Sequence, residues 1–145
     1  MKLSKRTEYG LRAVVQLARQ DPRVFVQVKD LAKDEGLPKK WLEAILLALK
    51  RGHFLESKVG SGGGYRLSRR PPDIRVGDLI RRLEGRLNTK EPLPADEMSP
   101  GEVAAHLINE RLTEATDEVL DDMTLEQLVE QVSRAGSTHQ SMYYI

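Results

Sequence analysis

The chain has 145 residues and no cysteine, so it is long enough for one small domain with an appendage, but disulfide bonds, thiolate metal sites and a cysteine nucleophile are excluded. Its net charge of +1 conceals a separation of sign, because residues 1–86 carry 20 Lys+Arg against 10 Asp+Glu, whereas residues 87–145 carry 3 against 12; a half this basic attracts polyanions. No run approaches the roughly 18 apolar residues of a membrane span and no signal-peptide pattern is present, so we expect a cytoplasmic protein without a membrane partner.

The basic half begins with three predicted helices. Apolar residues three and four positions apart indicate the first helix over about residues 5–20, and a segment containing proline ends it. Two more helices follow, near residues 28–35 and over about residues 38–52, and only a tight turn at Gly36 separates them. Two helices joined in this way are typical of a helix-turn-helix, whose second helix enters the major groove of DNA.

A glycine-rich loop lies between two strand-like runs, in the order FLESKV, GSGGG and YRLS. The loop does not match a P-loop, and Tyr65 stands where the dinucleotide-binding fingerprint needs its last glycine. We interpret the segment as a β-hairpin whose glycines permit a tight turn and let backbone N–H groups approach a DNA phosphate. The order of elements predicts a mostly α-helical winged helix-turn-helix over residues 1–86, with this small β-hairpin as its wing.

The acidic half predicts further helices. A short helix over residues 76–85 closes the first domain, and a proline-punctuated linker is expected at residues 87–101. Residues 102–135 are predicted to form a long helix and a C-terminal helix, and residues 136–145 a flexible tail. Two capping-box patterns mark the helix starts: Ser99 with Glu102, and Thr124 with Gln127.

The long helix carries a narrow apolar stripe with charged flanks. A stripe of this kind needs a partner helix to cover it. We therefore expect a homodimer in which the stripe forms the dimerisation surface. The stripe consists of Ala104, Ile108, Leu112, Ala115 and Val119.

Four segments together resemble one family of regulators. The chain resembles the Rrf2 family closely over residues 1–86 and by pattern beyond. The resemblance lies in the order and spacing of four segments: MKLSKRTEYGLRAVVQLA, VKDLAKDEGLPKKWLEAILLALKRGHFLES, GSGGGYRLSRRPPDIRVGDLIRRLEG and TLEQL. The resemblance implies a dimeric winged-helix repressor or activator with a long crossing helix for dimerisation. Many members hold an iron–sulfur cluster on three cysteines; this chain has none, so it resembles the cysteine-free branch, whose effectors are diverse.

The expected contacts with double-stranded DNA divide into base readout and phosphate binding. On the second motif helix, the side opposite the apolar face carries Lys40, Glu43 and Ala44, which we expect to meet guanine, cytosine and the thymine methyl group, respectively. Phosphate contacts, which fix the register of the protein on DNA, are expected from Lys2, Ser4, Lys5, Tyr9, Lys39, Lys58, Ser61, Gly62 and Arg66.

The remaining chemical candidates are interpreted as structural. His53, His106 and His139 are far apart and have no second ligand at metal spacing, so we expect no metal site and no cofactor. Trp41 and Tyr65 are expected to be core or hinge aromatics. The sequence predicts a sequence-specific regulator, not an enzyme, acting on a pseudo-palindromic operator, with any small-molecule effector unidentified. The alternatives are a winged-helix module that binds protein, and a small enzyme, for which no motif is found.

Overall fold

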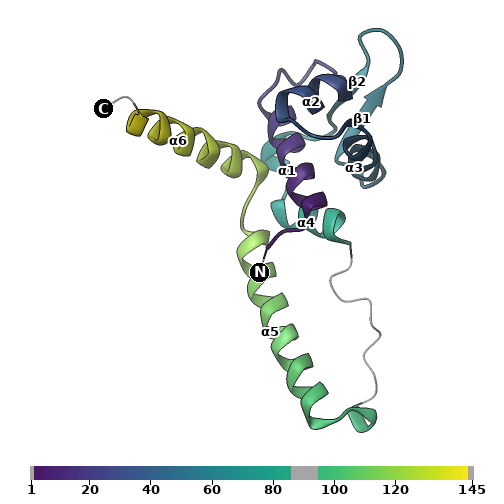
Figure 1. Cartoon of the computed structure of the whole chain (residues 1–145), viewed down its shortest axis with the longest axis vertical. Helices are drawn as coiled ribbons and strands as arrows, with labels where there is room; N and C mark the ends of the chain where they lie inside the picture. The colour runs from purple at the N-terminus through teal and green to yellow at the C-terminus, as the bar shows by residue number, and fades with distance from the viewer. Residues whose placement is uncertain (1, 86–94, 144–145) are drawn as a thin grey trace.

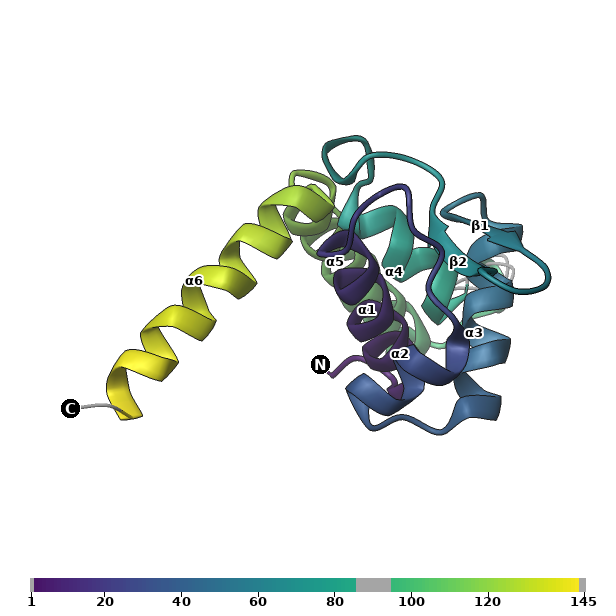
Figure 2. The same cartoon turned by 90° about the horizontal axis from the view of Figure 1, so that it is seen from above.

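The computed structural model describes residues 2–85 and 95–143, and it confirms a mostly α-helical chain with a small β-hairpin (Figures 1 and 2). Four helices and the hairpin form a body, from which two long helices, α5 and α6, lead away in different directions. No helix of the described residues is long and apolar enough to span a membrane. The elements are α1 (Lys5–Ala18), α2 (Val28–Glu35), α3 (Lys39–Arg51), β1 (Leu55–Lys58), β2 (Gly64–Leu67), η1 (Pro71–Asp73), α4 (Val76–Glu84), η2 (Ala95–Glu97), α5 (Pro100–Asp121) and α6 (Leu125–Tyr143).

The helix-turn-helix forms where the sequence predicts it. Gly36 ends α2 in the left-handed conformation, with φ 64° and ψ 38°, which glycine adopts without a Cβ clash. Pro38 was expected in the first turn of α3, but it precedes the helix as its N-cap with extended backbone. Three residues, Gly36 to Pro38, therefore separate α2 from α3.

The core of the body is built around the inner face of α3. Leu42, Ile45, Leu46 and Leu49 are all buried there, as their helical spacing predicts. They pack in one cluster with apolar side chains of α1, α2, the hairpin and α4. Burial of this stripe fixes the rotation of α3 about its own axis, so its other side faces solvent.

The glycine loop is a hairpin turn, as predicted, and its last glycine, Gly64, also allows a close backbone contact with another segment. β1 and β2 pair antiparallel, with Leu55 opposite Leu67. Gly64 has φ 133°, and a Cβ at this position would overlap the carbonyl oxygen of Val26. Its neighbour Tyr65 exchanges two backbone hydrogen bonds of 2.8 Å with Val26. The glycine thus lets the wing lie directly against the segment between α1 and α2.

Both predicted capping boxes are present at the starts of α5 and α6. The hydroxyl of Ser99 accepts a hydrogen bond from the N–H of Glu102, and the Glu102 carboxylate accepts one from the N–H of Ser99. Thr124 and Gln127 form the same reciprocal pair. α5 begins at Pro100, directly after the Ser99 cap that the sequence predicts and two residues before the predicted domain boundary at 102. Of the linker predicted at residues 87–101, residues 87–94 lie outside the described residues.

Residues 136–145, which were predicted as a flexible tail, have a helical backbone over most of their length. The backbone of α6 is helical to Tyr143, and residues 144–145 lie outside the described residues. No proline follows the Thr124 cap, and the one glycine, Gly136, costs a helix only about 1 kcal/mol relative to alanine. The small and polar residues that indicated a tail are therefore compatible with a continued helix.

The beginning of α6 belongs to the core of the body. Leu125 is completely buried in the same cluster as the α3 side chains. Its N–H donates to the carbonyl of Ile74 at 2.8 Å, and the N–H of Val76 donates to the carbonyl of Met123 at 2.9 Å. A residue far beyond the predicted domain end at 86 thus completes the core of the N-terminal domain.

Replacing Leu125 with Ala should lower the free energy of unfolding by about 2–5 kcal/mol, because it removes buried methyl groups and leaves a cavity. The matched control is Val59→Ala: Val59 is 96% exposed, and the change there should stay within about 0.5 kcal/mol. Urea denaturation at one fixed protein concentration measures both. Equal stability of the Leu125 variant and the control would contradict the shared core.

Candidate nucleic-acid interface

The outer face of α3 carries the predicted base-reading residues into solvent. Lys40, Glu43 and Ala44 are all exposed, on the side opposite the buried stripe. The Lys39 ammonium lies 3.8 Å from the Glu43 carboxylate. Exposed pairs one helical turn apart contribute only about 0.3–0.5 kcal/mol, so this contact would not hold Glu43 back from a base. The face has the side chains that direct readout in a major groove requires.

The wing lies on the same flank of the body as α3, away from α6 (Figures 1 and 2). Lys58, Ser61 and Gly62 are exposed at the end of β1 and in the turn. Arg66 is placed differently: its guanidinium forms an ion pair with Glu56, donates to the carbonyl of Arg23 at 3.2 Å, and lies 4.2 Å from the centre of the Phe25 ring. A phosphate contact by Arg66 would have to compete with these partners.

The N-terminal residues predicted to bind phosphate combine exposure with structural roles. Lys2 and Lys5 are exposed. The Ser4 hydroxyl caps α1 by accepting from the N–H of Thr7 at 3.2 Å, while the N–H of Ser4 donates to the Glu84 carboxylate at 3.0 Å. Glu84 accepts hydrogen bonds from the Thr7 hydroxyl, which has the larger effect, and from the Ser4 N–H. These bonds hold the pKa of Glu84 below the ordinary value of 4.5.

The interpretation of Trp41 as a core or hinge residue is wrong. Its side chain is 59% exposed on α3, and its ring centre lies 6.2 Å from that of Tyr9, at an interplanar angle of 51°. Tyr9 is half-buried and joins the edge of the core. Tyr65 packs against the core, as expected. The sequence missed the exposure of Trp41 because a large aromatic side chain in a helix is usually buried.

A group of arginines beside α3 was missed at the sequence level. The group consists of Arg6 from α1, Arg51 from α3 and Arg82 from α4. The helical period of any one segment cannot show that these three side chains lie together. The Arg82 Nε donates to the carbonyl of Ala48 at 2.9 Å, and the Arg6 Nε donates to the carbonyl of Leu83 at 3.1 Å. They line an open pocket next to the outer face of α3, formed by Arg6, Ala44, Leu47, Ala48, Arg51 and Arg82.

The histidines do not form a metal centre in the described part of the chain, where no group of three His, Cys, Asp or Glu side chains converges. His53 is exposed in a turn with φ 64°. His106 is exposed on α5, with its Nε2 3.2 Å from the Glu110 carboxylate. The side chain of His139 lies outside the described residues.

Comparisons with known proteins decide the family. The family model described as Rrf2, iron-dependent transcriptional regulator, matches residues 3–131. This chain belongs to the Rrf2 family. It is a DNA-binding transcriptional regulator of the winged-helix type and not an enzyme, which confirms these parts of the sequence prediction.

Individual relatives of the Rrf2 chain are similar over nearly all of its length. The transcriptional regulator CymR of Bacillus subtilis is 32% identical over 145 residues, all of both chains; its structure, that of a global cysteine regulator, superposes with a TM-score of 0.73 over 90% of this chain and 98% of that one. The regulator NsrR of Bacillus subtilis is 34% identical over 133 residues, covering 89% of this chain and 90% of NsrR. The structure of IscR from T. potens gives a TM-score of 0.74 at 31% identity, covering 93% and 90%.

The iron in the family description does not fit the donor set of this chain. The sequence holds no cysteine, so thiolate ligands are absent. His106 and Glu110 on α5 form a single exposed pair, and two ligands leave an iron ion without the protein cage that a resident site needs.

Replacing Glu84 with Gln should lower the free energy of unfolding near pH 7, because the amide accepts hydrogen bonds from Ser4 and Thr7 more weakly than the carboxylate does. Since the folded chain depresses the pKa of Glu84, this stabilisation is present above about 4.5, the ordinary value, and is lost as pH falls through the folded pKa. Urea denaturation at about pH 7 and about pH 3 should therefore give a difference between wild type and variant that shrinks on acidification. The control Glu97→Gln, at an exposed carboxylate, should show no such trend; a difference that grew with acid would contradict the assignment.

Proposed function

We propose that the protein is a homodimeric, sequence-specific regulator that acts in the cytoplasm. The α3 helices of its two subunits would read the two half-sites of a pseudo-palindromic operator. The observation that carries the proposal is the outer face of α3, where Lys40, Glu43 and Ala44 are exposed together. The wing lies on the same side of the body as α3 (Figures 1 and 2). Family membership supports DNA as the partner. The relatives named as transcriptional regulators support the same function.

Base readout would rest on the three side chains at the centre of this face. Lys40 can donate to O6 and N7 of guanine, Glu43 can accept from N4 of cytosine, and the Ala44 methyl can contact the thymine methyl group. Trp41 is exposed beside them and would come close to the DNA backbone or the groove edge.

Phosphate contacts would surround this reading centre. Lys39 is exposed on α3 itself, Lys2 and Lys5 are exposed at the N-terminal end of the chain, and Lys58 is exposed at the end of β1 in the wing. We add the arginines of the pocket beside α3, which are Arg6, Arg51 and Arg82. A guanidinium can grip a phosphate with two parallel N–H donors, so these side chains suit the task.

The homodimer is supported by the exposed stripe of α5. This helix has no buried residue, and Ile108, Leu112 and Val119 are 58%, 45% and 65% exposed. At about 100° per residue, Asp117 and Asp121, two partly buried positions near the C-terminal end of α5, lie roughly on the side opposite this stripe. A second copy of α5 would cover the stripe, and a two-fold axis would give the operator its symmetry.

The alternative of a winged-helix module that binds protein predicts different behaviour. Protein partners would bind with little dependence on salt, whereas DNA binding weakens steeply as salt rises because counterions are released. A salt titration of the wild type with duplex DNA separates the two functions.

Replacing Lys58 with Ala should weaken binding to all DNA sequences alike and reduce the salt slope by roughly 0.9 for each phosphate that the ammonium no longer neutralises. Replacing Glu43 with Ala should leave the slope nearly unchanged, but should relax the base preference at one position in each half-site by about 1–3 kcal/mol. Selection of sites from a random DNA pool, followed by salt titrations, measures both effects. Fluorescence of Trp41, the one tryptophan of the chain, can report binding.

The control for both variants is Arg19→Ala, an exposed charge at the end of α1, outside α3 and the wing. Its selected motif should equal that of the wild type. Identical motifs for wild type and Glu43→Ala would remove Glu43 from base readout. No enriched motif for the wild type would reject sequence-specific binding as a whole.

Replacing Ile108 and Leu112 together with Asp should dissociate the dimer, because two unpaired carboxylates buried in the seam would each cost several kcal/mol. Static light scattering at micromolar concentration should then give the mass of a monomer. Asn109→Asp is the control: it adds a charge at an exposed position of α5 outside the stripe and should leave the mass unchanged. A double variant that stays dimeric would show that the interface lies elsewhere.

A further inference from the structure

The long helix α5 is attached to the body at its C-terminal end. Two backbone hydrogen bonds join the segments on either side, from Leu125 to Ile74 and from Val76 to Met123. The guanidinium of Arg75 adds a bond of 2.7 Å to the carbonyl of Asp121. All side chains over residues 104–112 are exposed, and the helix extends far from the body (Figure 1). The C-terminal attachment of α5 to the body thus lies at residues 121–125, which we call the pivot.

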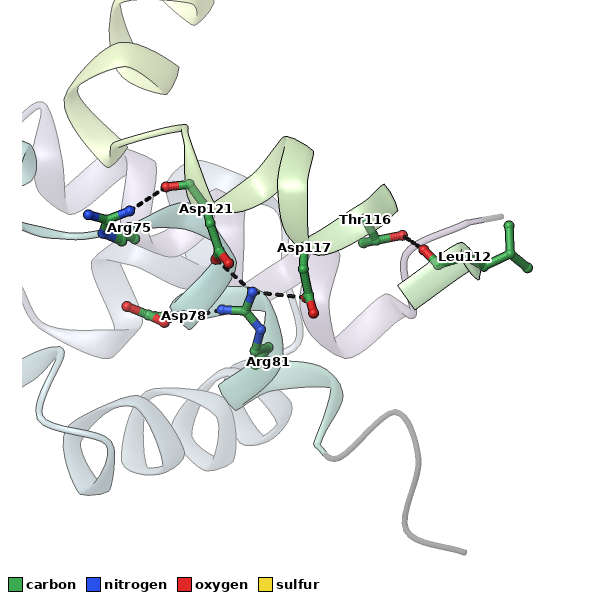
Figure 3. Close-up of polar contacts among 7 residues, drawn as sticks. All are labelled: Arg75, Asp78, Arg81, Leu112, Thr116, Asp117 and Asp121. Carbon is green, nitrogen blue, oxygen red and sulfur yellow. Dashed lines mark hydrogen bonds and ion pairs between the residues drawn. The ribbon is translucent and has the colours of Figure 1, made fainter. Parts of the chain in front are cut away.

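Arg81 holds α5 both at the pivot, through Asp121, and one helical turn before it, through Asp117. From α4, its guanidinium donates to Asp117 at 2.9 Å, to Asp121 at 2.6 Å and to Asp78 at 3.2 Å (Figure 3). The bonds to Asp121 and then Asp117 raise the pKa of Arg81 above its ordinary value, so the cation is retained. Without this cation three carboxylates would face one another, and their repulsion would push α5 away from α4.

The backbone of α4 is shaped for this close contact. Gly77 lies beside Asp121, and a Cβ there would stand 2.5 Å from the Asp121 Oδ1 and 3.1 Å from a guanidinium nitrogen of Arg81. Any larger side chain would displace the carboxylate. Gly77 and Arg81 together therefore set how closely α4 and α5 approach.

The contact lies on the opposite side of α5 from the apolar stripe. At about 100° per residue, Asp117 and Asp121 point roughly away from the side that carries Ile108 and Val119. The next residue on α4, Arg82, is hydrogen-bonded to the carbonyl of Ala48 on α3. A continuous set of contacts thus runs from the proposed dimer seam through α5 and α4 to the reading helix.

We infer that Arg81 is a positioning residue, which fixes the angle between α5 and the winged helix and so determines the half-site spacing that the dimer accepts. The inference rests on the proposed homodimeric DNA binding. In a two-fold dimer, the angle at each pivot sets the distance and rotation between the two α3 helices. One inserted base pair moves a half-site by about 3.4 Å and turns it by roughly a tenth of a helical turn, so a fixed angle rejects it.

The test compares operators that differ only in the number of central base pairs. The parent operator is the one selected by the wild type, and its spacer is shortened by one base pair or lengthened by one or two. For the wild type we expect each change to weaken binding by at least about tenfold, the cost of a disturbed base contact. For Arg81→Gln we expect this discrimination to fall to about threefold or less, while the salt slope is retained.

Two further variants separate positioning from a general loss of stability. Gly77→Ala keeps every charge and displaces Asp121 by its methyl group, and Arg81→Lys keeps the cation but lacks the planar fork that reaches both carboxylates. Both should broaden the accepted spacing. Arg19→Gln, which removes one exposed positive charge elsewhere, should keep the wild-type profile. Circular dichroism and light scattering identify any variant that does not fold or dimerise, and the remaining variants then carry the comparison.

A second measurement needs no DNA. Because the chain has no cysteine, Ser61→Cys introduces a single thiol at each wing tip, to which a spin label can be attached. The distribution of distances between the two labels in the dimer should be narrow in the wild-type background and several times broader with Arg81→Gln.

The outcomes distinguish this inference from the proposed function. If the wild type selects no motif or is a monomer, both fail. The other case is a wild type that selects a motif while Arg81→Gln and Gly77→Ala fold as dimers. If these variants then keep the wild-type spacing profile and distance distribution, the positioning role of Arg81 is overturned and the proposed function stands.

Discussion

The burial of one face of α3 is the constraint on which the rest of the body depends. Four leucine and isoleucine side chains of this helix lie within the core, with exposures of 3% or less. Burying each contributes about 1.5–3 kcal/mol, far more than any exposed ion pair on the same helix. The rotation of α3 is therefore decided by packing, and the side on which Lys40 and Glu43 lie follows from it; the weak, exposed pair between Lys39 and Glu43 adds little.

Charge divides the molecule as clearly as packing does. Residues 1–86 carry a surplus of basic side chains, 20 against 10 acidic ones, whereas residues 87–145 carry a surplus of acidic side chains, 12 against 3. An acidic appendage would be repelled by DNA phosphates, so it keeps to the side away from the proposed DNA surface. At Arg81 a cation of the basic part forms ion pairs with two carboxylates of α5, Asp117 and Asp121.

Local signals in the sequence predicted most of the fold. Gly36, the Ser99 box and the Thr124 box act within a few residues of themselves, so their effects can be read from short segments. The same holds for the buried stripe of α3, whose helical period is visible in the sequence. The stripe also predicted the exposure of Lys40 and Glu43, because the opposite side of a half-buried helix must face solvent.

What the sequence did not show depends on contacts between distant segments. Leu125 packs in the core of the N-terminal domain, although the sequence pattern of that domain ends about forty residues before it. The arginines that line the pocket beside the outer face of α3 come from three helices. Arg66 was expected to contact a phosphate. Its guanidinium pairs with Glu56, which the register of the hairpin places opposite it, and lies over Phe25, which the pairing of Val26 with Tyr65 brings near. Trp41 was misplaced because side-chain size predicts burial only on average.

The two backbone hydrogen bonds between Val26 and Tyr65 also bear on the entropy of association. They make the wing the neighbour of a third extended segment, so the hairpin is not an isolated two-stranded ribbon, which would be marginally stable in water. A wing that is already ordered in the free protein loses little conformational freedom when it meets its target. The free energy of its contacts then appears as affinity and is not consumed in ordering the loop, which makes the hairpin a pre-organised part of the binding surface.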